Sequence, residues 1–229
     1  MPISQQRLNK FLAERLGVSR READDMIAAR KQITVNGQPV KLGYRIDKED
    51  KVCYNGKIIP LRVNFLYLIL NKPVGYVCSK RRQGETPTVY ELLPEKYQLL
   101  KTVGRLDKDS SGLILLTNDG DFAFKMTHPK FGKIKTYLVE LDKALTPLHQ
   151  QMIAEFGIML PDGRSQLGLE RQDETRKHWL VTMSEGRNRQ IRRTFAALGY
   201  EVEKLDRLTF GSYRLGTLKR GESQEINLS

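Results

Sequence analysis

Cysteine, histidine and long apolar segments are scarce in this sequence. Its 229 residues include two cysteines and three histidines. Cys53 and Cys78 give neither a disulfide framework nor metal-ligand spacing, and the histidines have no Cys or Glu partners at such spacing. No apolar run approaches the ~20 residues that a membrane-spanning helix needs, and the N-terminus has no apolar secretion signal. We therefore expect a protein of the reducing cytoplasm that binds no metal and enters no membrane.

Positive charge is the feature present in excess. The chain has 39 Lys and Arg against 27 Asp and Glu, a net charge of +12, and its pI is near 9.7. The cations are denser near the N-terminus: they outnumber acidic residues by 13 to 7 in residues 1–64 and by 26 to 20 in residues 65–229. So basic a balance predicts a polyanionic partner, either nucleic acid or an anionic membrane surface, and we expect nucleic acid.

Residues 1–60 are predicted to form a small domain of two helices followed by short strands. Apolar residues recur at helical spacing from Leu8 to Leu16, and Gly17 is predicted to end that helix. Ser19 and Glu22 have the spacing of a capping box, which predicts the start of a second helix. Two later Asn-Gly pairs are typical of tight turns between paired strands, at residues 36–37 and 55–56.

Seven cations lie on or beside these helices: Arg7, Lys10, Arg15, Arg20, Arg21, Arg30 and Lys31. For any one of them a solvated surface is the better explanation. Neutralisation of phosphates by several cations is additive, however, so the cluster predicts nucleic-acid binding. Residues 6–59 resemble the small RNA-binding domain named after ribosomal protein S4. That resemblance implies an RNA-binding surface on the two helices and nothing about catalysis.

Residues 61–64 are interpreted as a linker to a second domain, residues 65–229. Short strands are predicted at residues 65–70, 113–117, 137–141, 179–183 and 201–205. Helices are predicted at residues 121–126, 147–156 and 188–198. Strands mixed with a few helices indicate an α+β fold on a largely antiparallel mixed sheet.

The densest candidate for chemistry is residues 104–120, where a polar loop runs into an apolar strand. Asp107, Asp109, Ser111 and Gly112 imitate a calcium loop, but Asn118 stands where its final Glu belongs. Asp107 and Asp109 are also compatible with a glycosidase-like carboxylate pair, although two-residue spacing in a loop fixes no separation. From this segment alone, turn and capping roles explain both acids equally well.

A second candidate is residues 184–193, where four arginines lie at the start of a predicted helix. Guanidinium groups near a helix N-terminus favour anions such as phosphate or carboxylate. Arg192 follows Ile191, which is predicted to face the core, so a buried Arg192 is placed to hold an acidic residue ionised. Tyr137 lies in an alternating strand where sheet packing explains it. No phosphate-binding glycine loop is present, so we expect no nucleotide cofactor.

Taken together, these segments resemble the bacterial ribosomal-RNA pseudouridine synthases of the RsuA type. The segments are Leu70-Asn71-Lys72-Pro73-Val74-Gly75, Gly104-Arg105-Leu106-Asp107, Ser111-Gly112-Leu113, Lys135-Thr136-Tyr137 and Glu185-Gly186-Arg187-Asn188-Arg189-Gln190-Ile191-Arg192-Arg193. The family isomerises a chosen uridine in RNA to pseudouridine. The resemblance implies catalytic roles for Asp107 as nucleophile, for Tyr137 stacked on the base, and for Arg192 in a salt bridge with Asp107. It further implies that Arg105 displaces the nucleotide from its stack and that Ile191 walls the pocket.

The leading hypothesis is therefore an isomerase that acts as a monomer on ribosomal RNA or an assembling ribosomal particle. Its predicted RNA contacts are Arg105, Arg187, Arg189, Ile191, Arg7, Lys10, Arg20, Arg21 and Lys31. One alternative is a non-catalytic RNA-binding or ribosome-assembly factor. Another is an RNA glycosidase or nuclease that uses Asp107 with Asp109, which would release free base or cut strands.

Overall fold

The structure is a computed structural model that describes residues 5–29, 32–60 and 64–227. Its contacts divide the chain into two compact units. The first comprises Met1–Tyr67 with the short segments Leu99–Lys101 and Thr117–Gly120, and the second comprises the remaining residues. Most of the predicted linker lies outside the described residues, and the domain boundaries at 60 and 65 stay a prediction. No helix in the described part of the chain is long and apolar enough to cross a membrane.

The first unit contains the two predicted helices, α1 (Leu8–Leu16) and α2 (Arg20–Ala28). Helix α1 ends at Gly17, whose φ of 70° suits glycine because a side chain would be strained there. The capping box at α2 is confirmed: the Glu22 N–H donates to Ser19 Oγ at 3.1 Å, and the Ser19 N–H donates to Glu22 Oε2 at 2.6 Å. The local sequence thus fixes both the end of α1 and the start of α2.

Short strands complete this unit. Strand β1 (Gln6–Arg7) pairs with β4 (Arg45–Ile46), and a second sheet has the order β3-β2-β5-β6. Its strands are β2 (Ile33–Val35), β3 (Gln38–Pro39), β5 (Val52–Tyr54) and β6 (Lys57–Ile58). Both Asn-Gly pairs have positive φ angles, 53° and 78° at residues 36–37 and 47° and 77° at residues 55–56. These are the left-handed conformations of tight hairpin turns, so both predicted turns are confirmed.

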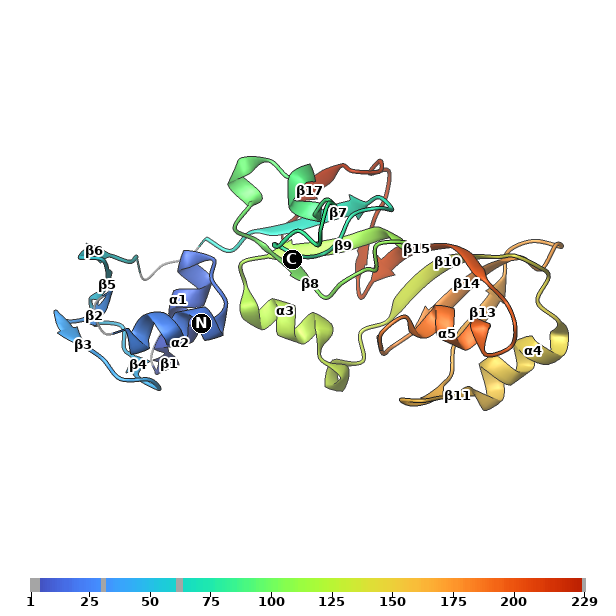
Figure 1. Cartoon of the computed structure of the whole chain (residues 1–229), viewed down its shortest axis with the longest axis horizontal. Coiled ribbons are helices and arrows are strands. Elements are labelled where there is room, and N and C mark those ends of the chain that lie inside the picture. Colours follow the sequence, from blue (N-terminus) through green and yellow to red (C-terminus); the bar gives the residue numbers. More distant parts are fainter. Residues whose placement is uncertain (1–4, 30–31, 61–63, 228–229) are drawn as a thin grey trace. The chain divides into compact units, whose positions relative to one another are not determined.

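The second unit is built on one mixed sheet, shown in Figure 1. Among the described residues its main path has the order β13-β14-β10-β15-β9-β7-β17, with β16 beside β15 and β8 beside β9. Strands β9 and β15 run parallel, whereas β10 is antiparallel to both β14 and β15. The strands are β7 (Tyr67–Lys72), β8 (Lys101–Val103), β9 (Ser111–Thr117), β10 (Lys135–Leu141), β13 (Gly168–Arg171), β14 (His178–Met183), β15 (Val202–Phe210), β16 (Tyr213–Arg214) and β17 (Ser223–Glu225).

Two helices pack on different ends of this sheet. Helix α5 (Gln190–Ala196) buries Ile191 and Phe195 in one core with Tyr137 and Val139 of β10. Helix α3 (Gly120–Thr127) buries Met126 in a second core with residues of β7, β8 and β9. Alternate residues of β10 are buried, from Lys135 through Tyr137 to Leu141, so this strand turns its charged Lys135 inward. Lysine is rarely buried in a core, so its position on this strand indicates a role beyond packing.

Several predicted elements differ from the observed ones in their bounds. The strand predicted at residues 65–70 is β7, which lies two residues later and continues through the buried Asn71 and Lys72. The helix predicted at residues 147–156 begins under the Thr146 cap as α4 (Pro147–Gln151) and continues as a π-helical turn, η4 (Met152–Phe156). The hairpin of β11 (Ile158–Leu160) and β12 (Gly163–Ser165) was not predicted, because neither three-residue strand has a clear alternating pattern.

Candidate active site

Asp107 lies in the loop between β8 and β9, and the buried side chain of Lys72 binds the backbone of that loop. Lys72 is fully buried, and its Nζ donates to the carbonyls of Asp107 at 3.0 Å, Ser110 at 2.6 Å and Pro73 at 3.0 Å. The Gly75 N–H donates to the Lys108 carbonyl at 2.8 Å. Burial lowers the pKa of Lys72 to about 8, although the nearby Asp107 and Asp109 oppose that shift. The loop is therefore held by its backbone, which leaves its side chains free to meet a ligand.

A cavity of about 380 Å³ opens beside this loop, entirely within the second unit. The structure brings several predicted residues together in its wall: Arg105, Asp107, Tyr137, Arg187, Arg189 and Ile191. Tyr137 and Ile191 are almost fully buried, with 7% and 4% of their surface exposed, whereas Arg105 is exposed. A carboxylate, an aromatic ring and an apolar wall thus border one space, and its size and lining fit a planar polar ligand.

The acidic and basic residues of the site pair differently from the prediction. Arg189 donates to both carboxylate oxygens of Asp109 at 2.9 Å each, while its Nη1 lies 3.8 Å from Asp107 Oδ2. Arg192 Nε lies 3.2 Å from Asp109 Oδ2, and its Nη2 donates to the Asp109 carbonyl at 2.9 Å. Arg192 therefore pairs with Asp109, and the expected salt bridge between Arg192 and Asp107 is not formed among the described residues.

Both arginines extend from the start of α5. Arg189 immediately precedes the helix in a left-handed conformation with φ of 46°. Arg192 also donates to the Val202 carbonyl, so its guanidinium is shared between β15 and Asp109. Burial raises the pKa of Asp109, but the hydrogen bonds from Arg189 and the charge of Arg192 outweigh burial and lower it. Asp109 is thus an ionised anchor for both arginines.

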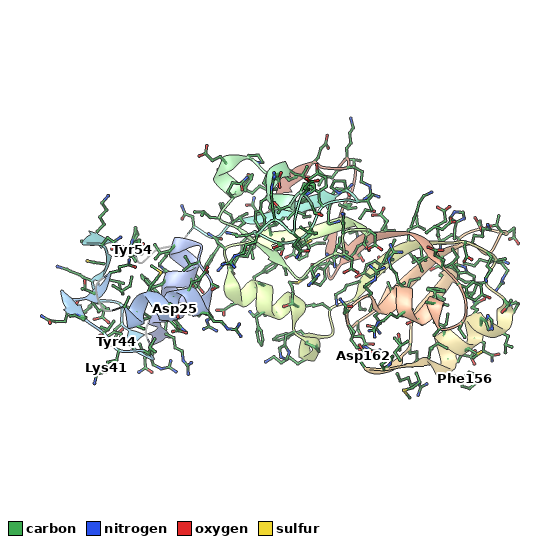
Figure 2. The ribbon with its side chains drawn as sticks, in the orientation of Figure 1. Asp25, Lys41, Tyr44, Tyr54, Phe156 and Asp162 are labelled. Carbon is green, nitrogen blue, oxygen red and sulfur yellow. The ribbon has the colours of Figure 1, made fainter. Side chains whose placement is uncertain are left out.

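Arg187 is engaged within the protein. Its guanidinium donates to the carbonyls of Asp162 at 3.0 Å, Gly163 at 2.9 Å and Arg164 at 2.9 Å, and to the Asp162 and Glu185 carboxylates. Asp162, labelled in Figure 2, also binds Arg193 through two hydrogen bonds of 3.0 and 2.7 Å. These contacts attach the β11–β12 hairpin to the loop before α5. A structural role therefore explains Arg187 better than a direct RNA contact.

Two buried cations in the cavity wall were missed by the sequence reasoning. Lys135 and Arg207 are 9% and 3% exposed, and both lie over the ring of Phe210, at 5.2 and 5.0 Å from its centroid. Lys135 Nζ donates to three backbone carbonyls, of Lys133, Ser184 and Glu185. Arg207 Nε donates to the Leu113 carbonyl, but its buried Nη2 has no hydrogen-bond partner among the described residues. The only sequence signal was a charge at an inward strand position.

The predicted RNA-binding cations of the first unit are mostly exposed. Arg7, Arg20 and Arg21 are exposed at the starts of α1 and α2, and Lys10 Nζ lies 3.8 Å from Glu14 Oε1 on the same helix. Lys31 lies outside the described residues. Arg15 differs from the rest of the cluster, since its guanidinium stacks 3.8 Å from the Phe11 ring centroid and its Nε donates to the Pro60 carbonyl. The exposed arginines thus remain available to a polyanion.

Comparison with known proteins identifies the class of enzyme that this fold and site belong to. A model of the RNA pseudouridylate synthase family matches residues 66–197, and a model of the S4 domain matches residues 6–52. The chain belongs to the RNA pseudouridylate synthase family, which isomerises uridine in RNA, and it carries an S4 domain in front of the catalytic part. The resemblance noted from its motifs is therefore confirmed.

Individual relatives match along nearly the whole chain. The ribosomal small subunit pseudouridine synthase A of Pasteurella multocida is 38% identical, with 96% of each chain covered. The ribosomal large subunit pseudouridine synthase B of Bacillus subtilis is 36% identical, covering 96% of this chain and 92% of that protein. A crystal structure of a pseudouridylate synthase is similar with a TM-score of 0.69 and 35% identity, over 96% of both chains.

Proposed function

We propose that this enzyme converts a specific uridine of ribosomal RNA to pseudouridine and that Asp107 is its nucleophile. The observation that carries the proposal is the cavity that gathers Asp107, Tyr137 and Ile191, in a chain of the RNA pseudouridylate synthase family. Relatives of similar identity are named for the small and for the large ribosomal subunit, so the RNA of each subunit is a candidate substrate.

In this proposal a carboxylate oxygen of Asp107 attacks C1′ of the ribose and breaks its bond to N1 of uracil. The freed uracil turns within the cavity, and C5 then displaces the carboxylate from C1′. The hydrogen on C5 leaves as a proton and N1 becomes protonated, so the product is an isomer of the substrate. The atoms balance without a co-reactant, so the reaction as proposed draws on no nucleotide cofactor and no metal.

The surrounding residues have supporting roles. Tyr137 stacks on the target base, and its hydroxyl relays the proton from C5 by giving up its own hydrogen as it receives one. Ile191 forms the apolar wall against the uracil. Arg189 provides a counter-charge 3.8 Å from Asp107, while Asp109 and Arg192 hold Arg189 and the start of α5 in place. Arg105 is exposed at the cavity and takes the position vacated by the target nucleotide. The cost of flipping a base is a few kcal/mol, which phosphate contacts offset.

The exposed cations of the first unit, Arg7, Arg20 and Arg21, supply phosphate contacts that are independent of base identity. All the residues invoked belong to one chain, so the proposal needs a monomer only. Both cysteines are free thiols, in keeping with a place of action in the reducing cytoplasm, on naked RNA or an assembling particle.

The test is release of tritium from ribosomal RNA labelled at C5 of uridine, with RNA of each subunit supplied separately. The wild-type enzyme is expected to release label from one of them, and Asp107→Asn to release none while still binding RNA. Tight binding without tritium release from any ribosomal RNA would favour the non-catalytic assembly factor. Free uracil or shortened strands would favour a glycosidase or nuclease.

A further inference from the structure

An exposed cluster of aromatic rings lies where α3 ends and the short 3₁₀ helix η3 (Pro129–Phe131) begins. Phe124 and Phe131 are 46% and 37% exposed, and their ring centroids are 5.8 Å apart at an interplanar angle of 89°. The His128 ring completes the cluster, 4.7 Å from Phe124 and 6.4 Å from Phe131. Among the described residues, neither Phe124 nor Phe131 is part of the cores that α5 and α3 form with the sheet.

Hydrogen bonds order the backbone between these rings. His128 Nδ1 accepts a hydrogen bond from the Lys130 N–H at 3.2 Å, and the His128 carbonyl accepts from the Phe131 N–H at 3.1 Å. The chain then turns at Gly132, whose φ is 51°. Because apolar rings gain no burial in water, an exposed cluster of three rings marks a candidate surface for a ligand.

Positive charge accompanies the rings. Lys130 Nζ lies 5.2 Å from the Phe124 centroid and 4.8 Å from the Phe131 centroid. Lys125 and Lys133 flank the cluster, and residues 122–134 contain no acidic residue. Aromatic faces interleaved with lysines are the combination that binds single-stranded nucleic acid, because bases stack on the rings while lysines meet phosphates.

The cluster is also continuous with the candidate active site. Thr127 and Pro129, which lie between its rings in the sequence, line the same cavity as Asp107 and Tyr137. A nucleotide next to a flipped target uridine would leave the cavity at this rim. The aromatic cluster therefore adjoins the cavity through Thr127 and Pro129, where a nucleotide that flanks the target uridine would emerge.

We propose that Phe124, His128 and Phe131 form a stacking platform for an unpaired base that flanks the target uridine, with Lys130 moving from the rings to the adjoining phosphate. This inference rests on the proposed function in that RNA is the ligand of the cavity. It adds a specificity requirement, since the flanking nucleotide must be unpaired or easily unpaired to reach the platform.

The test uses tryptophan as a reporter in the full-length chain. Phe124→Trp places an indole on the platform, and Phe156→Trp is the matched control, because Phe156 is 62% exposed on η4 and is labelled in Figure 2. The buried Trp179 gives the same background in both variants. Each variant is titrated with a single-stranded 12-nucleotide oligouridylate and with a 12-nucleotide abasic ribose-phosphate chain of equal charge.

Stacking predicts that oligouridylate quenches the fluorescence of Trp at position 124 but not at position 156, and that the abasic chain quenches neither. Equal quenching at both positions, equal quenching by both chains, or no quenching at position 124 would overturn the platform. In a second measurement Phe124→Leu is expected to weaken oligouridylate binding by about fivefold to tenfold, the low end for one stacked base, and Phe156→Leu to leave it unchanged. Equal affinities for the two leucine variants would also overturn it.

These outcomes are separable from those of the proposed reaction, because binding is measured without turnover. Quenching at position 124 with no tritium release from ribosomal RNA would sink the proposed reaction and leave the platform standing. Normal tritium release without quenching would do the reverse.

Discussion

Arg189 binds Asp109 through two hydrogen bonds of 2.9 Å while its Nη1 stays 3.8 Å from Asp107. The two acidic residues of the loop therefore differ in how closely they bind Arg189. Asp109 is held by Arg189 and Arg192, whereas Asp107 lines the cavity with one carboxylate oxygen near a cation. This separation supports the proposed assignment of Asp107 as the nucleophile and of Asp109 as an anchor for the neighbouring arginines.

Asp109→Asn should therefore weaken the reaction without abolishing it. The amide keeps the volume but loses the charge that anchors Arg189 and Arg192, a contribution of about 1 kcal/mol for a half-exposed pair, or roughly fivefold in kcat/KM. Tritium release measures this loss of activity. Asp107→Asn is the isosteric comparison and is expected to release no label. If Asp109→Asn proved as inactive as Asp107→Asn, the essential carboxylate would be wrongly assigned.

The buried Lys72 predicts a specific dependence of stability on pH. Its pKa is about 8 in the folded protein, against about 10.4 for an unburied lysine, so from pH 8 to 10 the unfolded chain holds a proton that the folded protein has released. The lowered pKa of Lys72 therefore increases the free energy of unfolding as the pH rises through that window, by up to about 2 kcal/mol between pH 7.5 and 9.5.

Urea unfolding of the wild type and of Lys72→Met across pH 7.5–9.5 measures this effect. The free energy of unfolding of the wild type should rise with pH relative to that of Lys72→Met, because methionine has no proton to release. Lys108→Met, at an exposed position of the same loop, should track the wild type throughout. A constant gap between wild type and Lys72→Met would show that Lys72 stays protonated in the folded protein.

Gly112→Ala should be severely destabilising. A Cβ there would lie 2.3 Å from the Arg207 carbonyl oxygen and 2.5 Å from both the Arg207 nitrogen and Asp206 Oδ1, where β9 and β15 pair. Gly75 is the matched control, because its φ of 92° resembles the 105° of Gly112 but nothing lies within 4 Å of its Cβ position. Gly75→Ala should cost about 1–2 kcal/mol from backbone strain alone. Similar melting temperatures for both variants would contradict the close approach of the strands.

Arg207→Met should separate stability from activity. A buried guanidinium with an unpartnered Nη2 carries a desolvation cost, which methionine removes while losing one hydrogen bond to the Leu113 carbonyl. The free energy of unfolding should therefore change by no more than about 1 kcal/mol. Because the cation lines the cavity and the proposed RNA substrate is anionic, kcat/KM should fall by roughly tenfold or more. Loss of folding, or unchanged activity, would show that Arg207 is a packing residue.

Local physics alone determined much of the fold. The end of α1 at Gly17, the capping box of Ser19 and Glu22, both Asn-Gly turns and the Thr146 cap of α4 all depend on residues within one turn of each other. For that reason they were predictable from the sequence. The same holds for the inward position of Tyr137 on an alternating strand. The family motifs added the expectation that Asp107, Tyr137 and Ile191 meet, and the cavity gathers them.

Only the tertiary structure decided which charges pair. Three sets of contacts join segments 35 to 94 residues apart. They are the pairing of Arg192 with Asp109, the hydrogen bond of Lys72 to the Asp107 carbonyl, and the hydrogen bonds of Lys135 and Arg207 to the Ser184 and Leu113 carbonyls. No local pattern encodes such contacts, because a long flexible cation reaches several acceptors and only the packed backbone fixes which one is near. The sequence thus placed Asp107, Tyr137 and Ile191 among the candidate site residues, whereas the fold added Lys135 and Arg207 to the cavity wall and determined which charges pair.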